Sequence, residues 1–196
     1  GIVKKTSLSE FQAIRRGGLN AINLDEDDEL IDVKFTDGEN RIMLGTRGGK
    51  AITFPEDGVR SMGRIARGVR GITLADGDEV VAMDILKNDS EVLTVTEGGY
   101  GKRTTASEYR TQTRGGKGLI NMKVTDKTGP VVGIRVVREN QELMLITTEG
   151  IVIRTSVDEI SLISRNTQGV KLMTIAESDR VASMATMNRI VDSAGE

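Results

Sequence analysis

Short apolar segments, separated by glycine-bearing polar turns, recur along the whole chain. The longest apolar runs are four to six residues and are rich in Val, Ile, Leu and Met. In the segment 142–155, two apolar stretches flank the turn Thr148-Glu149-Gly150, which predicts two strands joined by a tight turn. The only helical signal is the capping-box spacing from Ser7 to Glu10, which predicts a turn or two of helix.

The strand-like segments repeat with a period of about 50 residues. One set begins with a glycine at spacings of 48, 50 and 51 residues, at Gly1, Gly49, Gly99 and Gly150. A second glycine recurs with the same period, at spacings of 50, 50 and 51 residues, at Gly18, Gly68, Gly118 and Gly169. Two anchors that share one period over the full length indicate four similar units, which we number 1 to 4.

This repetition predicts the fold class and the domain organisation. About four strands in each unit favour an all-β, propeller-like array in which each small sheet stacks on its neighbours. We expect one domain over residues 1–196, with repeats at roughly 1–48, 49–98, 99–149 and 150–196. A parallel β-solenoid is the alternative architecture.

Composition excludes several classes of function. The chain has no His and no Cys, so the usual zinc, haem and iron–sulfur ligand sets and the Ser-His-Asp or Cys-His nucleophiles cannot be assembled. No apolar run approaches the roughly 18 residues that a membrane span needs, and we expect neither a membrane segment nor a signal peptide. The default compartment is the cytoplasm.

Two strings that resemble ligand motifs fail in detail. The segment 98–104 is similar to a phosphate loop, but Thr96, which precedes it, stands where the first glycine of such a loop belongs, and Arg103 follows Lys102 where Ser or Thr is needed. The acidic run 25–29 lacks the glycine that a calcium loop requires. We therefore expect no metal, no cofactor and no small-molecule substrate.

The formal net charge of −2 conceals a segregation of the two signs. The first parts of the units, residues 1–23, 49–74, 99–124 and 150–175, carry net charges of +3, +3, +5 and +1. The second parts, residues 24–48, 75–98, 125–149 and 176–196, carry −5, −6, −1 and −2. Because equivalent positions of a repeat array occupy equivalent places, this predicts a basic band opposed to an acidic one, as on a nucleic-acid-binding surface.

The aromatic content indicates which nucleic acid would bind. Single strands are usually held by bases stacked on aromatic or arginine side chains. Here the aromatic residues do not recur in phase; they are Phe11, Phe35, Phe54, Tyr100 and Tyr109. Lysine and arginine without interleaved aromatics favour contacts to duplex phosphates, which give affinity without reading sequence.

One seven-residue window ends in glycine in all four units: residues 12–18, 62–68, 112–118 and 163–169. Its third position is arginine in three of them, at Arg64, Arg114 and Arg165. Glycines let a backbone approach a phosphate closely, and Arg and Lys add positive charge. A glycine-rich turn that simply leads into a strand is the competing interpretation.

At these residues the sequence resembles the C-terminal domain of DNA gyrase A. That family has a Gln-Arg-Arg-Gly-Gly-Lys-Gly box, which residues Gln112, Thr113, Arg114, Gly115, Gly116, Lys117 and Gly118 match at six of seven positions, differing at Thr113. Segments 59–64, 68–72, 99–104 and 165–170 are also similar to the family. The resemblance implies a β-pinwheel, a propeller-like array of four-stranded blades, whose basic rim wraps duplex DNA and so supports negative supercoiling.

The resemblance also implies limits. The family usually has about six blades, so we expect a fragment that corresponds to the last four, non-catalytic by itself, from an ATP-dependent type II topoisomerase of the bacterial cytoplasm and nucleoid. Its partners would be double-stranded DNA, the rest of gyrase A, and gyrase B. Neither Tyr100 nor Tyr109 inherits the strand-cleaving role. The corresponding C-terminal domain of topoisomerase IV and a propeller-like protein-interaction scaffold are the alternatives.

The expected DNA-contacting set is drawn from the basic residues of the first parts of the units. Its members are Lys5, Arg15, Arg16, Arg60, Arg64, Arg67, Arg70, Lys102, Arg103, Arg110, Arg114, Lys117, Arg154, Arg165 and Lys171.

Overall fold

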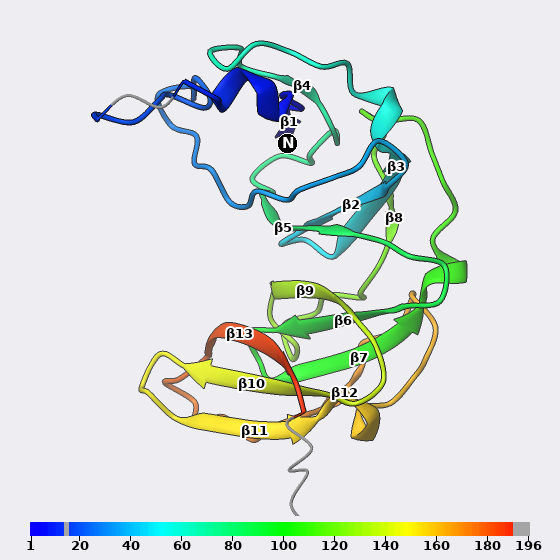
Figure 1. The fold of residues 1–196 in the computed structure, drawn as a ribbon. Coiled ribbons are helices and arrows are strands. Elements are labelled where there is room, and N and C mark those ends of the chain that lie inside the picture. Colours follow the sequence, from blue (N-terminus) through cyan, green and yellow to red (C-terminus); the bar gives the residue numbers. More distant parts are fainter. Residues whose placement is uncertain (14–15, 190–196) are drawn as a thin grey trace, which may run out of the picture.

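The computed structural model describes residues 1–13 and 16–189. Its strands form four small sheets, which follow one another along a curved path (Figure 1). Neighbouring strands pair antiparallel, as in the β2–β3 and β10–β11 hairpins. The predicted all-β, propeller-like array is therefore confirmed, and the parallel solenoid is wrong.

The second and third sheets have four strands each. The second has the order β5-β2-β3-β8, with β5 at Val80–Ile85, β2 at Arg41–Thr46, β3 at Lys50–Pro55 and β8 at Leu119–Ile120. The third has the order β9-β6-β7-β12, with β9 at Val131–Val137, β6 at Glu91–Thr96, β7 at Tyr100–Thr105 and β12 at Val170–Lys171. Strands β5 and β9 form the inner edges of these sheets, and β8 and β12 form the outer edges.

The two end sheets are smaller. The first pairs β1, Ile2–Val3, with β4, Val69–Arg70. The fourth has the order β11-β10-β13, with β11 at Val152–Ser156, β10 at Gln141–Thr147 and β13 at Val181–Asn188. The expectation of four strands per sheet thus fails, within the described residues, for these two sheets.

Outer strands are exchanged between units. Strand β8 belongs to unit 3 by sequence but pairs with β3 of unit 2, and β12 of unit 4 pairs with β7 of unit 3. Strand β4 of unit 2 pairs with β1 of unit 1 in the same way. Each of these three sheets therefore depends on the following unit for its outer strand.

A repeated threonine closes the hairpins. The side-chain oxygens of Thr46, Thr96 and Thr147 accept the backbone N–H of the residue four positions on, at 3.1, 3.3 and 3.2 Å. All three threonines are buried. Because buried polar atoms need partners, this bond explains why threonine precedes the glycine turn in each of these hairpins.

A short 3-10 helix follows the second strand of each of the hairpins β2–β3, β6–β7 and β10–β11. These helices are η2, Glu56–Gly58; η3, Ala106–Glu108; and η4, Val157–Glu159. A further one, η1 at Leu8–Phe11, has Ser7 as its N-cap, where the side chain accepts the N–H of Ser9. The short helix predicted from the capping signal is therefore present.

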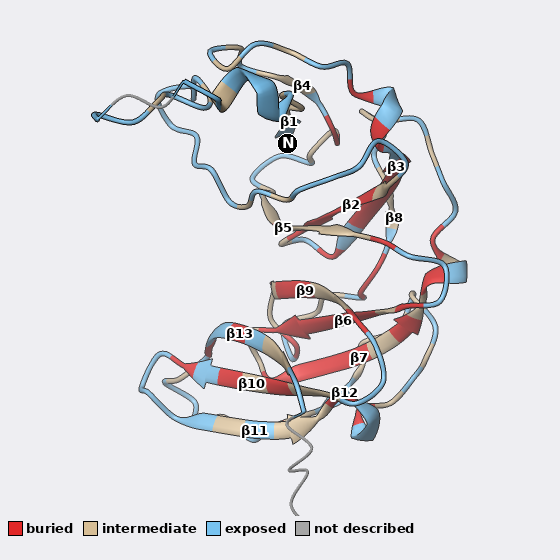
Figure 2. Ribbon diagram, viewed as in Figure 1, coloured by how far each residue is buried: buried red, intermediate tan, exposed pale blue. Residues whose placement is uncertain are grey.

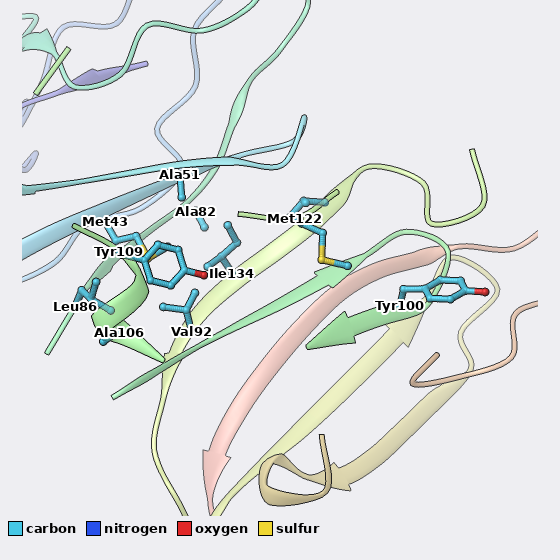
Figure 3. Packing of buried hydrophobic residues seen from close by; sticks show 11 residues of the cluster. Met43, Ala51, Ala82, Leu86, Val92, Tyr100, Ala106, Tyr109, Met122 and Ile134 are labelled. Carbon is cyan, nitrogen blue, oxygen red and sulfur yellow. The ribbon is translucent and has the colours of Figure 1, made fainter. Parts of the chain in front are cut away.

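The core lies between consecutive sheets, and β2, β3, β6 and β7 are the strands with the largest share of buried residues (Figure 2). Between the second and third sheets, the ring of Tyr109 is surrounded by Met43, Leu86, Val92 and Ile134 (Figure 3). Leu93 and Leu143 belong to an equivalent cluster between the third and fourth sheets. Among the inner strands, β5 also packs against β9, and β9 packs against β13.

A polar chain crosses this core. The Tyr109 hydroxyl donates to Oδ1 of Asn121, whose Nδ2 donates to Oγ1 of Thr94 at 3.0 Å. All three residues are at most 1% exposed. Burial raises the pKa of the Tyr109 phenol, so the hydroxyl remains protonated and a donor.

Replacing Tyr109 by Phe should lower the free energy of unfolding by about 1–3 kcal/mol, because the buried oxygen of Asn121 loses its donor. Urea denaturation measures the change. Tyr100→Phe is the matched control, since the Tyr100 hydroxyl makes no hydrogen bond to another described residue. Equal stability of the two variants would contradict the assigned bond.

Candidate nucleic-acid interface

The seven-residue windows form turns along the outer edges of the sheets. We call residues 62–68, 112–118 and 163–169 the box turns; they lead into β4, β8 and β12. The equivalent window of unit 1, residues 12–18, includes Arg15, which lies outside the described residues. Arg16, next to it, is exposed.

Each box turn is fixed to the preceding unit at its first residue. The backbone N–H groups of Met62, Gln112 and Ile163 donate to the carbonyls of Lys5, Thr53 and Arg103, at 2.8, 2.7 and 2.9 Å. These acceptors hold equivalent places in units 1, 2 and 3. The turns therefore repeat in space as well as in sequence.

The final glycine of each box turn is required for the strand exchange. Gly68, Gly118 and Gly169 have φ of +105°, +71° and +74°, a region that residues with a Cβ rarely adopt. A Cβ on Gly118 would lie 2.5 Å from the carbonyl oxygen of Ala51, and the equivalent distances at Gly68 and Gly169 are both 2.6 Å. This backbone contact explains the glycine anchor of the repeat.

The turn of unit 3 has further bonds to unit 2. The N–H of Gly115 donates to Gly71 O at 2.6 Å, and Thr73 donates its hydroxyl to Gly115 O and its N–H to Gly116 O. An open hollow of about 540 Å³ lies against this turn, lined by Phe54, Pro55, Gly58, Thr111, Gln112, Thr113 and Arg114. The buried side-chain nitrogen of Gln112 has no hydrogen-bond partner among the described residues.

Lys102 is not a surface residue, and its assignment to the DNA-contacting set is wrong. Its side chain is 0% exposed, and Nζ donates to Ser164 O at 2.7 Å, to Thr167 Oγ1 at 3.1 Å and to Arg165 O. Burial lowers the pKa of Lys102 to about 8; Glu108 opposes this shift and Arg165 adds to it. Lys102 therefore holds the box turn of unit 4 from inside.

Three other members of the predicted set are engaged with the protein. Lys5 donates to Glu56 O at 2.9 Å, Arg103 pairs with Glu91 at 2.7 Å, and Arg154 bonds to Glu142 at 2.8 Å. Lys5 and Arg103 are half-buried, whereas Arg154 is exposed. Lys5 thus contacts η2, Arg103 contacts β6, and Arg154 contacts β10.

The arginines at the third position of the box turns are half-buried. Arg64, Arg114 and Arg165 each donate to a backbone carbonyl of the preceding unit. The box turns therefore combine side chains that face the protein with others that face solvent.

The solvent-facing cations lie in and beside the box turns and on the outer strands. They are Arg60, Arg67, Arg70, Arg110, Lys117 and Lys171. Arg67 pairs with Asp25 at 2.6 Å, and Nζ of Lys171 lies 5.9 Å from the centre of the Tyr100 ring. Within the part of the chain that the structure describes, the side chains of the other four form no hydrogen bond or ion pair.

Two exposed lysines on the same edge were missed from the sequence. Lys50 lies opposite Ile120 in the β3–β8 pairing, and the N–H of Lys123 donates to Thr167 O in the box turn of unit 4. Their equivalents in other units are not basic, so a search for in-phase charge passes over them.

Several acidic side chains lie toward the inner strands. Asp78 precedes β5 and accepts the N–H of Gly48 at 2.7 Å, and Asp179, before β13, accepts that of Glu149 at 3.1 Å. The box turns lead instead to the outer strands. No helix in the described residues is long and apolar enough to cross a membrane, and the same residues contain no acidic cluster suited to a metal ion.

Small antiparallel sheets in a curved series, with outer strands exchanged between units, define a propeller-like β-pinwheel domain. The model of the family described as DNA gyrase C-terminal domain, beta-propeller, matches residues 1–37, 40–87, 90–138 and 141–186. The chain belongs to this family, that of the C-terminal domain of DNA gyrase A.

Comparisons with individual proteins agree with this family assignment. The chain is 49% identical over 195 residues to the DNA gyrase A protein of Haloquadratum walsbyi and 47% identical over 192 residues to that of Salmonella typhimurium, covering 98% of this chain in each case. It spans 23% and 22% of the length of these relatives.

Solved structures show the same architecture. A C-terminal domain of DNA topoisomerase IV matches with a TM-score of 0.90 and 29% identity over 96% of this chain and 59% of that one. A DNA gyrase A C-terminal domain matches with a TM-score of 0.80 and 26% identity, over 87% and 58%.

The titration of Lys102 gives a testable pH dependence. Its pKa in the folded chain, about 8, lies below the ordinary 10.5, so between these values the unfolded chain binds more protons and the stability contributed by Lys102 rises with pH. The difference in unfolding free energy between the parent chain and Lys102→Met should therefore increase from pH 8 to pH 10.5 and be constant below pH 8.

Denaturant titrations across this pH range measure the difference in unfolding free energy. Because both chains contain the other lysines, the titration of those lysines cancels in the comparison. A difference that is independent of pH would show that Lys102 titrates normally.

Proposed function

We propose that this chain binds duplex DNA without sequence specificity and wraps it along its outer edge. The observation that carries the proposal is the repetition of box turns on successive outer edges, each accompanied by exposed cations. Arg60 and Arg70 accompany the turn of unit 2, Arg110 and Lys117 that of unit 3, and Lys171 that of unit 4. Contacts of this kind reach phosphates and position the duplex.

The curvature of the array supports wrapping. A duplex that follows the outer edges of sheets on a curved path (Figure 1) must bend. Bending 20–30 base pairs by 40–90° costs on the order of 1–6 kcal/mol. Each further unit that the duplex reaches adds phosphate contacts, which offset this cost.

In the whole protein, the domain would supply wrapped DNA to the other parts of gyrase. We infer that it is non-catalytic by itself, and that together with the rest of gyrase A and with gyrase B it supports negative supercoiling in the cytoplasm. The corresponding role in topoisomerase IV is the near alternative. A protein-interaction scaffold is the alternative from another class, and it would bind through loops with little dependence on salt.

Affinity for duplex DNA should depend on both length and salt. We expect the chain to bind a duplex of about 150 base pairs more tightly than one of about 20, and binding to both to weaken steeply as salt rises, because phosphate contacts release counterions. Fluorescence anisotropy at several salt concentrations measures this. Weak binding that responds to neither length nor salt would favour the scaffold.

Neutralising two exposed cations should reduce the salt dependence by a defined amount. Arg110→Gln combined with Lys117→Gln removes two phosphate contacts, so the slope of log K against log salt should become shallower by about 1.8. The matched control is Lys87→Gln with Arg138→Gln, which removes two exposed cations from segments that follow inner strands. If both pairs change the slope equally, the contacts are not specific to the outer edge.

A further inference from the structure

The third-position arginines of the box turns form a regular series of bonds between units. Nη1 of Arg64 donates to Asn20 O at 3.1 Å, Nη1 of Arg114 to Arg70 O at 3.0 Å, and Nη1 of Arg165 to Ile120 O at 2.7 Å. Each acceptor lies two residues after the final glycine of the preceding unit's window. We call these three arginines the arginine ladder.

The ladder joins the outer edges of consecutive units. Arg70 and Ile120 are the last residues of the outer strands β4 and β8, and the arginines that bond to them belong to the next box turn. Arg114 also donates Nε to Gly58 O at 2.8 Å, so one guanidinium connects two carbonyls of unit 2. The planar fork of arginine suits such a double contact, which a lysine ammonium does not reproduce.

The rest of each turn is fixed by other groups. Nζ of Lys4 donates to Arg64 O, and Nζ of Lys102 donates to Arg165 O. In unit 2 the lysine position is occupied by Ile52, whose Cδ1 would lie 3.6 Å from a Cβ on Gly116. The main chain of each turn is thus already anchored, which leaves the guanidinium to link one edge to the next.

The position of the arginine ladder allows it to affect the rotation of each sheet relative to the next. Contacts between adjacent sheets are concentrated at the inner strands, where β5 packs on β9 and β9 on β13. The outer strands β4, β8 and β12 are only two residues long. With the inner edges packed, a bond between outer edges sets how far each sheet is rotated from its neighbour.

We propose that Arg64, Arg114 and Arg165 are positioning residues, which set the step between consecutive DNA-contacting turns and hence the curvature imposed on bound DNA. This inference rests on the proposed function. It reassigns these three residues, which the sequence alone places among the phosphate contacts. Affinity for one turn would then depend on the exposed cations, and the gain in affinity with duplex length would depend on the ladder.

The test compares two double variants that remove the same charge. One is Arg114→Gln with Arg165→Gln, from the ladder; the other is Arg110→Gln with Lys117→Gln, from the exposed cations. Affinity and salt slope are measured for each on duplexes of about 20 and about 150 base pairs. The measured quantities are the salt slope on the short duplex and the ratio of long-duplex to short-duplex affinity.

The ladder variant should keep the parental salt slope on the short duplex and lose roughly tenfold in the affinity ratio, which corresponds to about 1.4 kcal/mol. The exposed-cation variant should lose slope on the short duplex. A ladder variant with a shallower slope and an unchanged ratio, or with neither quantity changed, overturns the proposal.

A charge-conserving pair, Arg114→Lys with Arg165→Lys, separates charge from geometry and decides the matter if the glutamine pair does not fold, as judged by circular dichroism. It should lose the affinity ratio as the glutamine pair does; retention of the parental ratio overturns the proposal. If the parent chain itself shows neither salt dependence nor length preference, the proposed function fails, and that outcome is distinct from failure of the ladder.

Discussion

The architecture depends on the close backbone contact that ends each box turn. A strand from one unit completes the sheet of the preceding unit only where its entering glycine can lie against a carbonyl, as Gly118 does against Ala51. Because this glycine also has a positive φ, any side chain would meet both strain and a clash. The exchange makes neighbouring units interdependent, so the outer edge is continuous although each unit is small.

Two kinds of cation lie at these turns: some bond to the protein and fix the turn, and others face solvent. Lys102 is buried with three oxygen acceptors, which offset the cost of removing an ammonium from water. Lys117 occupies the turn of unit 3 and is exposed. Unit 2 has Ile52 where units 1 and 3 have Lys4 and Lys102, and there the next turn is anchored through its glycines to Gly71 and Thr73. Equivalent turns are thus fixed in two ways, either by a lysine ammonium or by hydrogen bonds between the glycines of the turn and Gly71 and Thr73.

The sequence predicts the repeat, the strand-rich fold and the family, because glycine and threonine recur where backbone geometry demands them. It does not predict which basic side chains face outward. Lys102 and Arg103 are adjacent on β7, and successive residues of a strand point to opposite faces, yet the face that is covered depends on a turn donated by the next unit. Lys50 and Lys123 were missed because the equivalent positions of the other units are not basic. A side chain can nevertheless be exposed on the outer edge without a basic counterpart in other units.

Affinity and shape are therefore separable properties of one edge. In the proposed complex with DNA, the number of exposed cations would set how many phosphates are neutralised, and each would contribute a similar salt-dependent increment. The rotation between sheets would set whether successive contacts with that DNA fall along one bent path, and bending energy rises with the curvature that the path imposes. The bonds of Arg64, Arg114 and Arg165 join neighbouring units away from the inner strands, where the sheets pack. If these bonds set the rotation, as proposed, a chain of this kind would change its curvature without changing its charge. Net charge alone is thus a poor guide to wrapping, and the geometry of the turn-to-turn links is the better one.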